Sequence, residues 1–69
     1  MSFPRRKVMK ALADRGYLVI REGSRHTIVG KPGERGEPVP RHDEINRITM
    51  RRIAKNLGID WASFEAEIR

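Results

Sequence analysis

Near its start the chain shows apolar residues at helical spacing. The positions that share this spacing are Val8, Ala11 and Leu12, which lie three and four residues apart as one face of a helix requires. The segment Ser2-Phe3-Pro4 is typical of a helix start, with a capping-type serine and a proline, and Gly16 is typical of a left-handed helix end. We therefore predict a first helix that runs from this start to Arg15.

A second helical pattern covers the last third of the chain. Its core face consists of Met50, Ile53, Ala54 and Leu57, again three and four residues apart. The pattern predicts a helix from Ile45 to Gly58, with Asp43 and Glu44 placing negative charge at its start. Asp60 then caps a last short helix, whose apolar side chains are Trp61, Phe64 and Ile68.

Between the helices, three short segments are typical of strands. Residues 17–21 and 26–29 are rich in aromatic and β-branched side chains, and the turn between them contains Gly23, which we expect to adopt a positive φ. Residues 37–41 form a third strand that contains Pro38 and Pro40. Two prolines two residues apart can both face outward, so we place this strand at a sheet edge.

These elements predict an α+β fold in the order α-β-β-β-α with a short extra C-terminal helix. A three-stranded antiparallel sheet is covered by helices on one face. If Val29 lies opposite Pro38, His26 lies near Arg41 and one step from His42, so both histidines sit at one end of the sheet.

The sequence leaves the face of His26 open. His26 and Ile28 share one side of their strand, whereas Thr27 and Val29 share the other. Either the strand end bends, or Val29 is the core residue.

Charge and residue usage narrow the partner and exclude several chemistries. The 69 residues include 15 Lys and Arg against 9 Asp and Glu, a net charge of +6 that favours nucleic acid or an acidic protein as partner. The chain has no cysteine and only two histidines, so we expect no disulfide, no metal and no cofactor. The longest apolar run, at residues 17–20, is too short to span a membrane, and we expect a cytoplasmic protein.

His26 is the candidate for proton transfer, because an unperturbed histidine titrates at about pH 6.5. The turn before it offers Ser24 and the guanidinium of Arg25 to a phosphate. The alternatives remain a surface histidine at a strand start for His26 and a helix-entry residue for His42. The neighbouring carboxylates of residues 43 and 44 are poorly placed for acid–base catalysis, and the glycines of residues 30–36 open no helix as a phosphate-binding loop would.

Four segments, in this order and spacing, resemble the HicA toxins of type II toxin–antitoxin systems. They are Arg15-Gly16-Tyr17 at the helix end, Gly23-Ser24-Arg25-His26, Val39-Pro40-Arg41-His42 and residues 49–59. The resemblance extends from about Val8 to Phe64 and treats residues 1–69 as a single HicA-like domain. The family often has histidine where Arg25 stands and glycine where Ile48 stands.

The resemblance implies a fold similar to double-stranded RNA-binding domains and an endoribonuclease that acts on mRNA until a HicB antitoxin covers it. It places the catalytic histidine at His26. The residues that we expect to bind RNA are Ser24, Arg25, Arg41, His42, Arg47, Arg51, Arg52 and Lys55. The alternatives are a non-catalytic module that binds double-stranded RNA and an adaptor whose basic face docks an acidic partner.

Overall fold

Three helices and five strands make up the fold of residues 1–69, which a computed structural model describes in full. In chain order they are β1 (Ser2–Pro4), α1 (Arg5–Asp14), β2 (Leu18–Glu22), β3 (His26–Gly30), β4 (Glu37–Pro40), β5 (Glu44–Asn46), α2 (Arg47–Leu57) and α3 (Trp61–Ile68).

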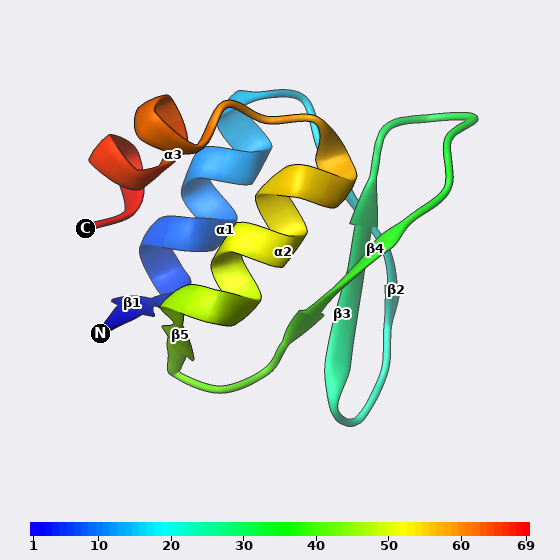
Figure 1. Ribbon diagram of the computed structural model, residues 1–69. Helices are drawn as coiled ribbons and strands as arrows, with labels where there is room; N and C mark the ends of the chain where they lie inside the picture. Colours follow the sequence, from blue (N-terminus) through cyan, green and yellow to red (C-terminus); the bar gives the residue numbers. More distant parts are fainter.

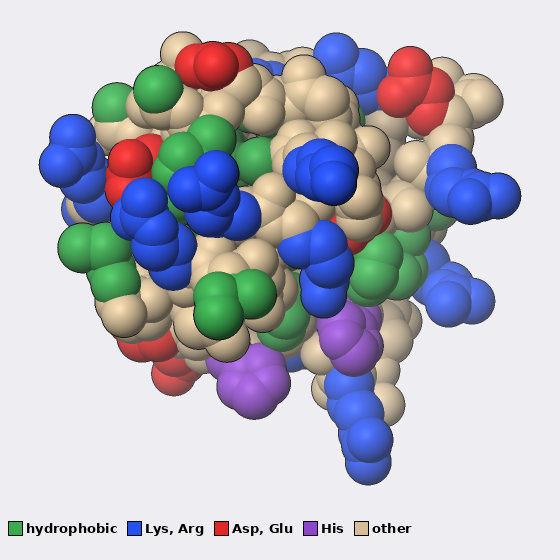
Figure 2. Space-filling view, in the orientation of Figure 1, with side chains coloured by type: hydrophobic (Ala, Val, Ile, Leu, Met, Phe, Trp, Pro, Cys, Tyr) green, Lys and Arg blue, Asp and Glu red, His purple; other side chains and the backbone are tan.

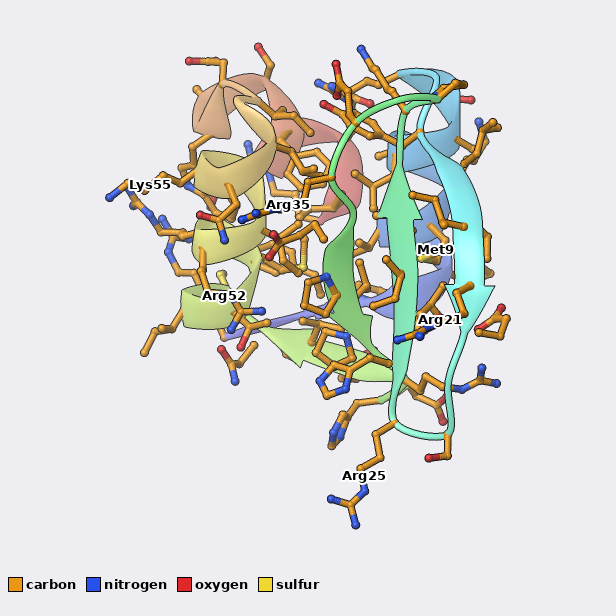
Figure 3. The ribbon with its side chains drawn as sticks, turned by 90° about the vertical axis from the view of Figure 1, so that its right-hand side faces the viewer. Met9, Arg21, Arg25, Arg35, Arg52 and Lys55 are labelled. Carbon is orange, nitrogen blue, oxygen red and sulfur yellow. The ribbon has the colours of Figure 1, made fainter.

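The central sheet is antiparallel with strand order β2-β3-β4. Helices α1 and α2 both lie on one face of it, and the other face is uncovered (Figures 1 and 3). Thr27, Val29 and Val39 point to the covered face and are at most 1% exposed. The predicted α+β architecture, with one sheet face covered and a C-terminal helix added, is confirmed.

The side of the sheet that His26 occupies is now settled. Val29 belongs to the core, whereas His26 is exposed and lies on the uncovered face. The predicted register is wrong by one residue, because Val29 pairs with Glu37 and His26 pairs with Pro40. The two prolines of β4 point to the uncovered face, and β4 is an edge strand as predicted.

Two strands were not predicted, and they replace the expected helix starts. β1 pairs with β5 in a separate two-stranded sheet, with Phe3 opposite Ile45. The side chains of Phe3 and Ile45 are 1% and 2% exposed. Their burial in the core favours extended backbone in β1 and β5, the segments that precede α1 and α2. The prediction that residues 2–4 start the first helix is wrong, because α1 begins at Arg5 without a side-chain cap.

The start of the second helix also differs from the prediction. α2 begins at Arg47 rather than near Ile45, and Asn46 caps it by accepting a 2.8 Å hydrogen bond from the backbone N–H of Thr49. Glu44 lies in β5, where its carboxylate accepts a hydrogen bond from Ser2 at 2.8 Å. The acidic pair of residues 43 and 44 therefore lies outside the helix.

The helix ends and apolar faces agree with the sequence. Gly16 and Gly58 follow α1 and α2 with φ of 89° and 74°, a conformation that glycine adopts without strain. Of the core positions predicted for the first two helices, only Leu57 is partly rather than fully buried. The buried ones are Val8, Ala11, Leu12, Met50, Ile53 and Ala54. None of the three helices has the length and apolar character that a membrane-spanning helix needs.

α3 docks on the same core, as predicted. Asp60 caps it by accepting from the backbone N–H of Ser63 at 3.1 Å, and Phe64 and Ile68 are fully buried. Arg15 of α1 bonds Glu67 of α3 at 2.6 Å. The hydrogen bond with Glu67 raises the pKa of Arg15 above its ordinary value, and this contact links the end of α1 to α3.

Candidate functional site

The turn between β2 and β3 is closed by one backbone hydrogen bond. The N–H of Gly23 donates to the carbonyl oxygen of His26 at 2.8 Å, with Ser24 and Arg25 between them. Gly23 does not adopt a positive φ, so that prediction is wrong. A Cβ at this position would lie 3.1 Å from the His26 carbonyl oxygen, and the close approach of the backbone is what favours glycine here.

The end of β4 continues to pair beside this turn. The N–H of Arg41 donates to the carbonyl oxygen of Arg25 at 3.1 Å, one step beyond the last paired residues of the two strands. The turn and the β4 end therefore border one open cavity of about 390 Å³, which we call the hairpin cavity. Its lining consists of Ser24, Arg25, His26, Arg41 and His42.

The predicted residues at this end of the sheet thus come together, although they come from two separate segments. All five lining residues are exposed and none is apolar. The two histidines lie at one edge of the molecule, and basic side chains lie above and below one of them (Figure 2). Arg25 extends from the tip of the turn away from the protein (Figure 3).

A chain of polar contacts positions Arg41 at the cavity. Arg41 Nη1 donates to Glu22 Oε1 at 2.6 Å, and the same carboxylate oxygen accepts from the hydroxyl of Thr27 at 2.7 Å. That hydroxyl in turn accepts from Arg5 Nη2 at 2.6 Å, and Arg5 Nε donates to the carbonyl oxygen of Pro40 at 3.2 Å. The contacts link α1 to all three strands of the sheet.

Sequence reasoning missed this chain of contacts. Thr27 is 0% exposed and occupies a core position of β3, on the same face of the strand as Val29. A buried polar side chain requires hydrogen-bond partners. A threonine at a core position of a strand is therefore the feature of the sequence that indicates such contacts. Which residues would supply the partners, from 5 to 22 positions away, depends on the fold.

The two arginines of the hairpin cavity differ in whether they form an ion pair within the chain. Glu22 offsets the charge of Arg41, whereas Arg25 forms no ion pair within the chain. Neither imidazole makes a hydrogen bond to another residue. His26, His42 and Arg25 are therefore free to contact a ligand, and Arg41 is held in place beside them.

The remaining predicted RNA contacts form a second basic surface on α2, which we call the helix stripe. It consists of Arg47, Arg51, Arg52 and Lys55. None of these residues lines the hairpin cavity. In Figure 3, Lys55 projects from α2 on the side away from β2.

Most of the helix stripe already has partners. Arg47 forms an ion pair with Glu65 at 2.5 Å, and Arg52 approaches Glu37 at 3.8 Å. The guanidinium groups of Arg47 and Arg51 each lie 5.4 Å from the ring centroid of Trp61. Glu37 is a buried carboxylate that the sequence did not single out.

The fold and this site define a small basic α+β protein with a histidine-containing cavity at one end of its sheet. Residues 5–59 match the family model described as the HicA toxin of bacterial toxin–antitoxin systems. The chain therefore belongs to the HicA toxin family, and it is a toxin of a toxin–antitoxin system. No curated protein and no solved structure matches it.

Proposed function

We propose that this toxin is an endoribonuclease of a type II system that cleaves mRNA with His26 as general base. The observation that supports the proposal is the hairpin cavity itself. It gathers two unbonded imidazoles and two guanidinium groups around one open space large enough to admit an RNA backbone. Groups that move protons and groups that neutralise phosphate are the two requirements of RNA cleavage.

The reaction needs only groups that the substrate and the cavity supply. The neutral imidazole of His26 takes the proton of a ribose 2′-hydroxyl, and the 2′-oxygen attacks the adjacent phosphorus. The bond from phosphorus to the 5′-oxygen of the next nucleotide then breaks, leaving a 2′,3′-cyclic phosphate. A proton from His42 completes the 5′-hydroxyl of the departing strand. The attacking hydroxyl belongs to the substrate, so no metal-bound water is required.

Arg25 and Arg41 would hold the scissile phosphate in this scheme. Charge builds on the phosphoryl oxygens in the transition state, and a guanidinium can donate to two of them at once. Arg41 is pre-positioned by Glu22 at 2.6 Å. Arg25 stands on the turn without an ion pair and can follow the substrate, and Ser24 adds a hydroxyl beside it.

The helix stripe would contribute binding rather than chemistry. Lys55 and Arg51 are exposed and can contact phosphates along the RNA backbone, with little dependence on base sequence. Such contacts release counterions, so binding should weaken as salt rises. Arg52 would add a further contact, although Glu37 partly offsets its charge.

We further propose that the resting partner is a HicB-type antitoxin protein. A chain with a net charge of +6 favours a partner with an acidic surface. A segment that covered the hairpin cavity would keep RNA from His26, and would at the same time neutralise Arg25.

The test is to express the wild-type toxin and His26→Ala in growing bacteria and to follow RNA cleavage directly. We expect growth arrest and RNA fragments from the wild type, and a loss of about 100- to 10,000-fold in cleavage rate from His26→Ala. Arg21→Ala is the matched control, since Arg21 is exposed on β2 and does not line the hairpin cavity. Intact RNA with both proteins, while RNA binding persists, would favour a non-catalytic RNA-binding module instead.

A further inference from the structure

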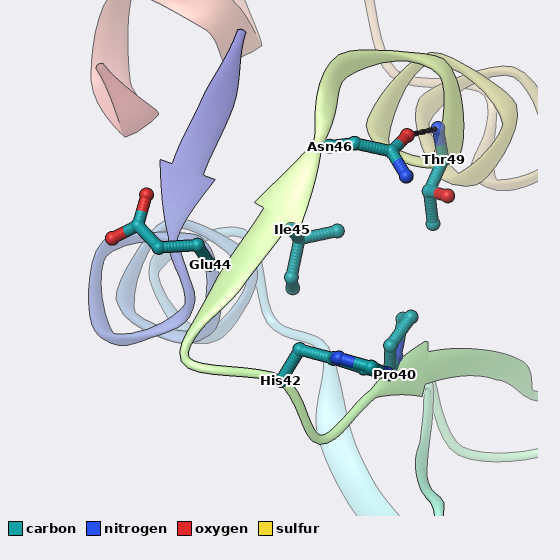
Figure 4. A pocket seen from close by; sticks show the side chains of 6 residues that line it. All are labelled: Pro40, His42, Glu44, Ile45, Asn46 and Thr49. Carbon is teal, nitrogen blue, oxygen red and sulfur yellow. Dashed lines mark hydrogen bonds between the residues drawn. The ribbon is translucent and has the colours of Figure 1, made fainter.

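A second, smaller cleft adjoins the hairpin cavity. It has a volume of about 180 Å³ and lies between the end of β4, β5 and the first turn of α2 (Figure 4). Its lining consists of Pro40, His42, Glu44, Ile45, Asn46 and Thr49. His42 lines both spaces, so a strand of RNA held at His26 would pass the mouth of this cleft.

We propose that this cleft binds one unpaired base of the RNA, next to the phosphate that is cleaved, and prefers guanine or uracil, which carry a keto group at the purine 6-position or the pyrimidine 4-position. The proposal rests on the proposed ribonuclease function and adds a base-recognition site to it. The cleft is smaller than the roughly 300 to 1,000 Å³ of pockets for drug-sized ligands, and its size suits a single base.

The walls of the cleft fit a flat ring. Ile45 is 2% exposed and forms an apolar floor, and the ring of Pro40 lies beside it. The imidazole of His42 extends toward Pro40 in Figure 4 and makes no hydrogen bond within the chain. Unstacked RNA bases are commonly held by stacking on aromatic side chains, including histidine.

The polar groups of the cleft set its preference. Asn46 Oδ1 accepts from the backbone N–H of Thr49 at 2.8 Å, which holds this oxygen toward the helix, so the group that the amide presents to a ligand is Nδ2 with its two donors. In Figure 4 this nitrogen points into the cleft. The hydroxyl of Thr49 has no partner in the chain, and the carboxylate of Glu44 is turned away and accepts from Ser2.

An amide that presents its nitrogen distinguishes bases by the exocyclic group at the purine 6-position or the pyrimidine 4-position. Guanine and uracil carry a keto oxygen there, which can accept from Asn46, whereas adenine and cytosine carry an amino group there, which is itself a donor. The usual two-bond contact of asparagine with adenine needs the amide oxygen to face the base, whereas here it faces the N–H of Thr49. We therefore expect guanine or uracil at one fixed position beside the cleaved bond.

The experiment measures this preference with a pool of RNA oligonucleotides of randomised sequence, whose cleavage products are sequenced. The variants are Asn46→Ser, which keeps a capping side chain without the amide, and Thr49→Val, which removes the hydroxyl and keeps the backbone donor. Asp60→Ser makes the equivalent change at the start of α3 and is the control. We expect Asn46→Ser to reduce the keto preference about fivefold, the worth of one neutral hydrogen bond, while Asp60→Ser leaves it unchanged.

The possible results separate the two proposals. A wild-type toxin that cleaves RNA without any base preference, or variants that keep the wild-type preference, would overturn the cleft proposal and leave the ribonuclease proposal standing. Variants that cleave all sequences more slowly to the same degree, or that weaken only antitoxin binding, would also overturn it. A wild-type toxin that cleaves no RNA would contradict the proposed function itself.

Discussion

The two basic regions of this toxin differ in how much of their charge is already engaged. In the helix stripe, Arg47 and Arg52 pair with Glu65 and Glu37. In the hairpin cavity, Arg25 and both imidazoles have no partner within the chain. A count of basic residues ranks the helix stripe highly, whereas the groups without partners gather at the turn. On this difference we propose RNA binding for the helix stripe and cleavage for the hairpin cavity.

After His26→Ala, removing the arginine that Glu22 holds in the hairpin cavity should have the largest effect. Arg41→Ala deletes a positioned donor to the phosphate, and we expect a loss of about 100-fold in cleavage rate at saturating RNA. The ion pair with Glu22 is half exposed, so unfolding free energy should change by about 1 kcal/mol or less. Arg21→Ala, with the same loss of charge on the same sheet, should cleave at the wild-type rate.

The support beneath the cavity can be tested separately. Thr27→Val keeps the shape of the buried side chain but leaves Arg5 and Glu22 without their shared hydroxyl. We expect a loss of about 1 to 3 kcal/mol in unfolding free energy, measured in urea, together with slower cleavage. Thr49→Val removes a hydroxyl that has no partner in the chain and should stay within about 0.5 kcal/mol of the wild type. Equal stability of the two variants would show that the buried contacts do not support the site.

Within the helix stripe, Arg47 should behave differently from its neighbours. Arg47→Ala removes the ion pair with Glu65 and the contact with Trp61, and should lower the unfolding free energy by about 1 kcal/mol. Lys55→Ala has no such partner to lose and should leave stability unchanged. Thermal or urea unfolding of both variants measures this difference in stability. If Arg47→Ala weakened RNA binding without lowering the unfolding free energy, the prediction would be contradicted.

The smallest effect concerns the salt dependence of RNA binding. If Arg51 and Lys55 each neutralise one phosphate, Arg51→Ala/Lys55→Ala should reduce the slope of log affinity against log salt by about 1.4 for single-stranded RNA. Filter binding to an uncleavable RNA at several salt concentrations measures the slope. The charge-conserving double variant Arg51→Lys/Lys55→Arg should keep the wild-type slope, and a reduced slope there would point to a specific contact instead.

The sequence predicted those elements that have a strong local signal. Helical spacing identified the apolar faces of α1 and α2, Gly16 and Gly58 marked their ends, and Asp60 marked the cap of α3. The prolines of β4 identified an edge strand because proline cannot donate to a neighbouring strand. In each case the physical cause acts within a few residues along the chain.

The misses depend on contacts between distant segments. The pairing of Phe3 with Ile45 joins two three-residue strands, too short to show alternation, and Ser2-Phe3-Pro4 satisfies the usual signals of a helix start. The one-residue error in register arose because the loop between β3 and β4 does not itself fix which residues pair. The two histidines and Arg41 were nevertheless expected at one end of the sheet, as observed, because the antiparallel order alone brings the β4 end back to the turn.

The most direct test of the division between the two regions is the rate of cleavage at saturating RNA, measured in single turnovers for two variants. His26→Ala should remain slower than the wild type by about 100- to 10,000-fold however much RNA is added. Arg51→Ala/Lys55→Ala should regain the wild-type rate at saturation, because it lost only affinity. A wild-type rate for His26→Ala, or a persistent loss for the double variant with none for His26→Ala, would contradict the account.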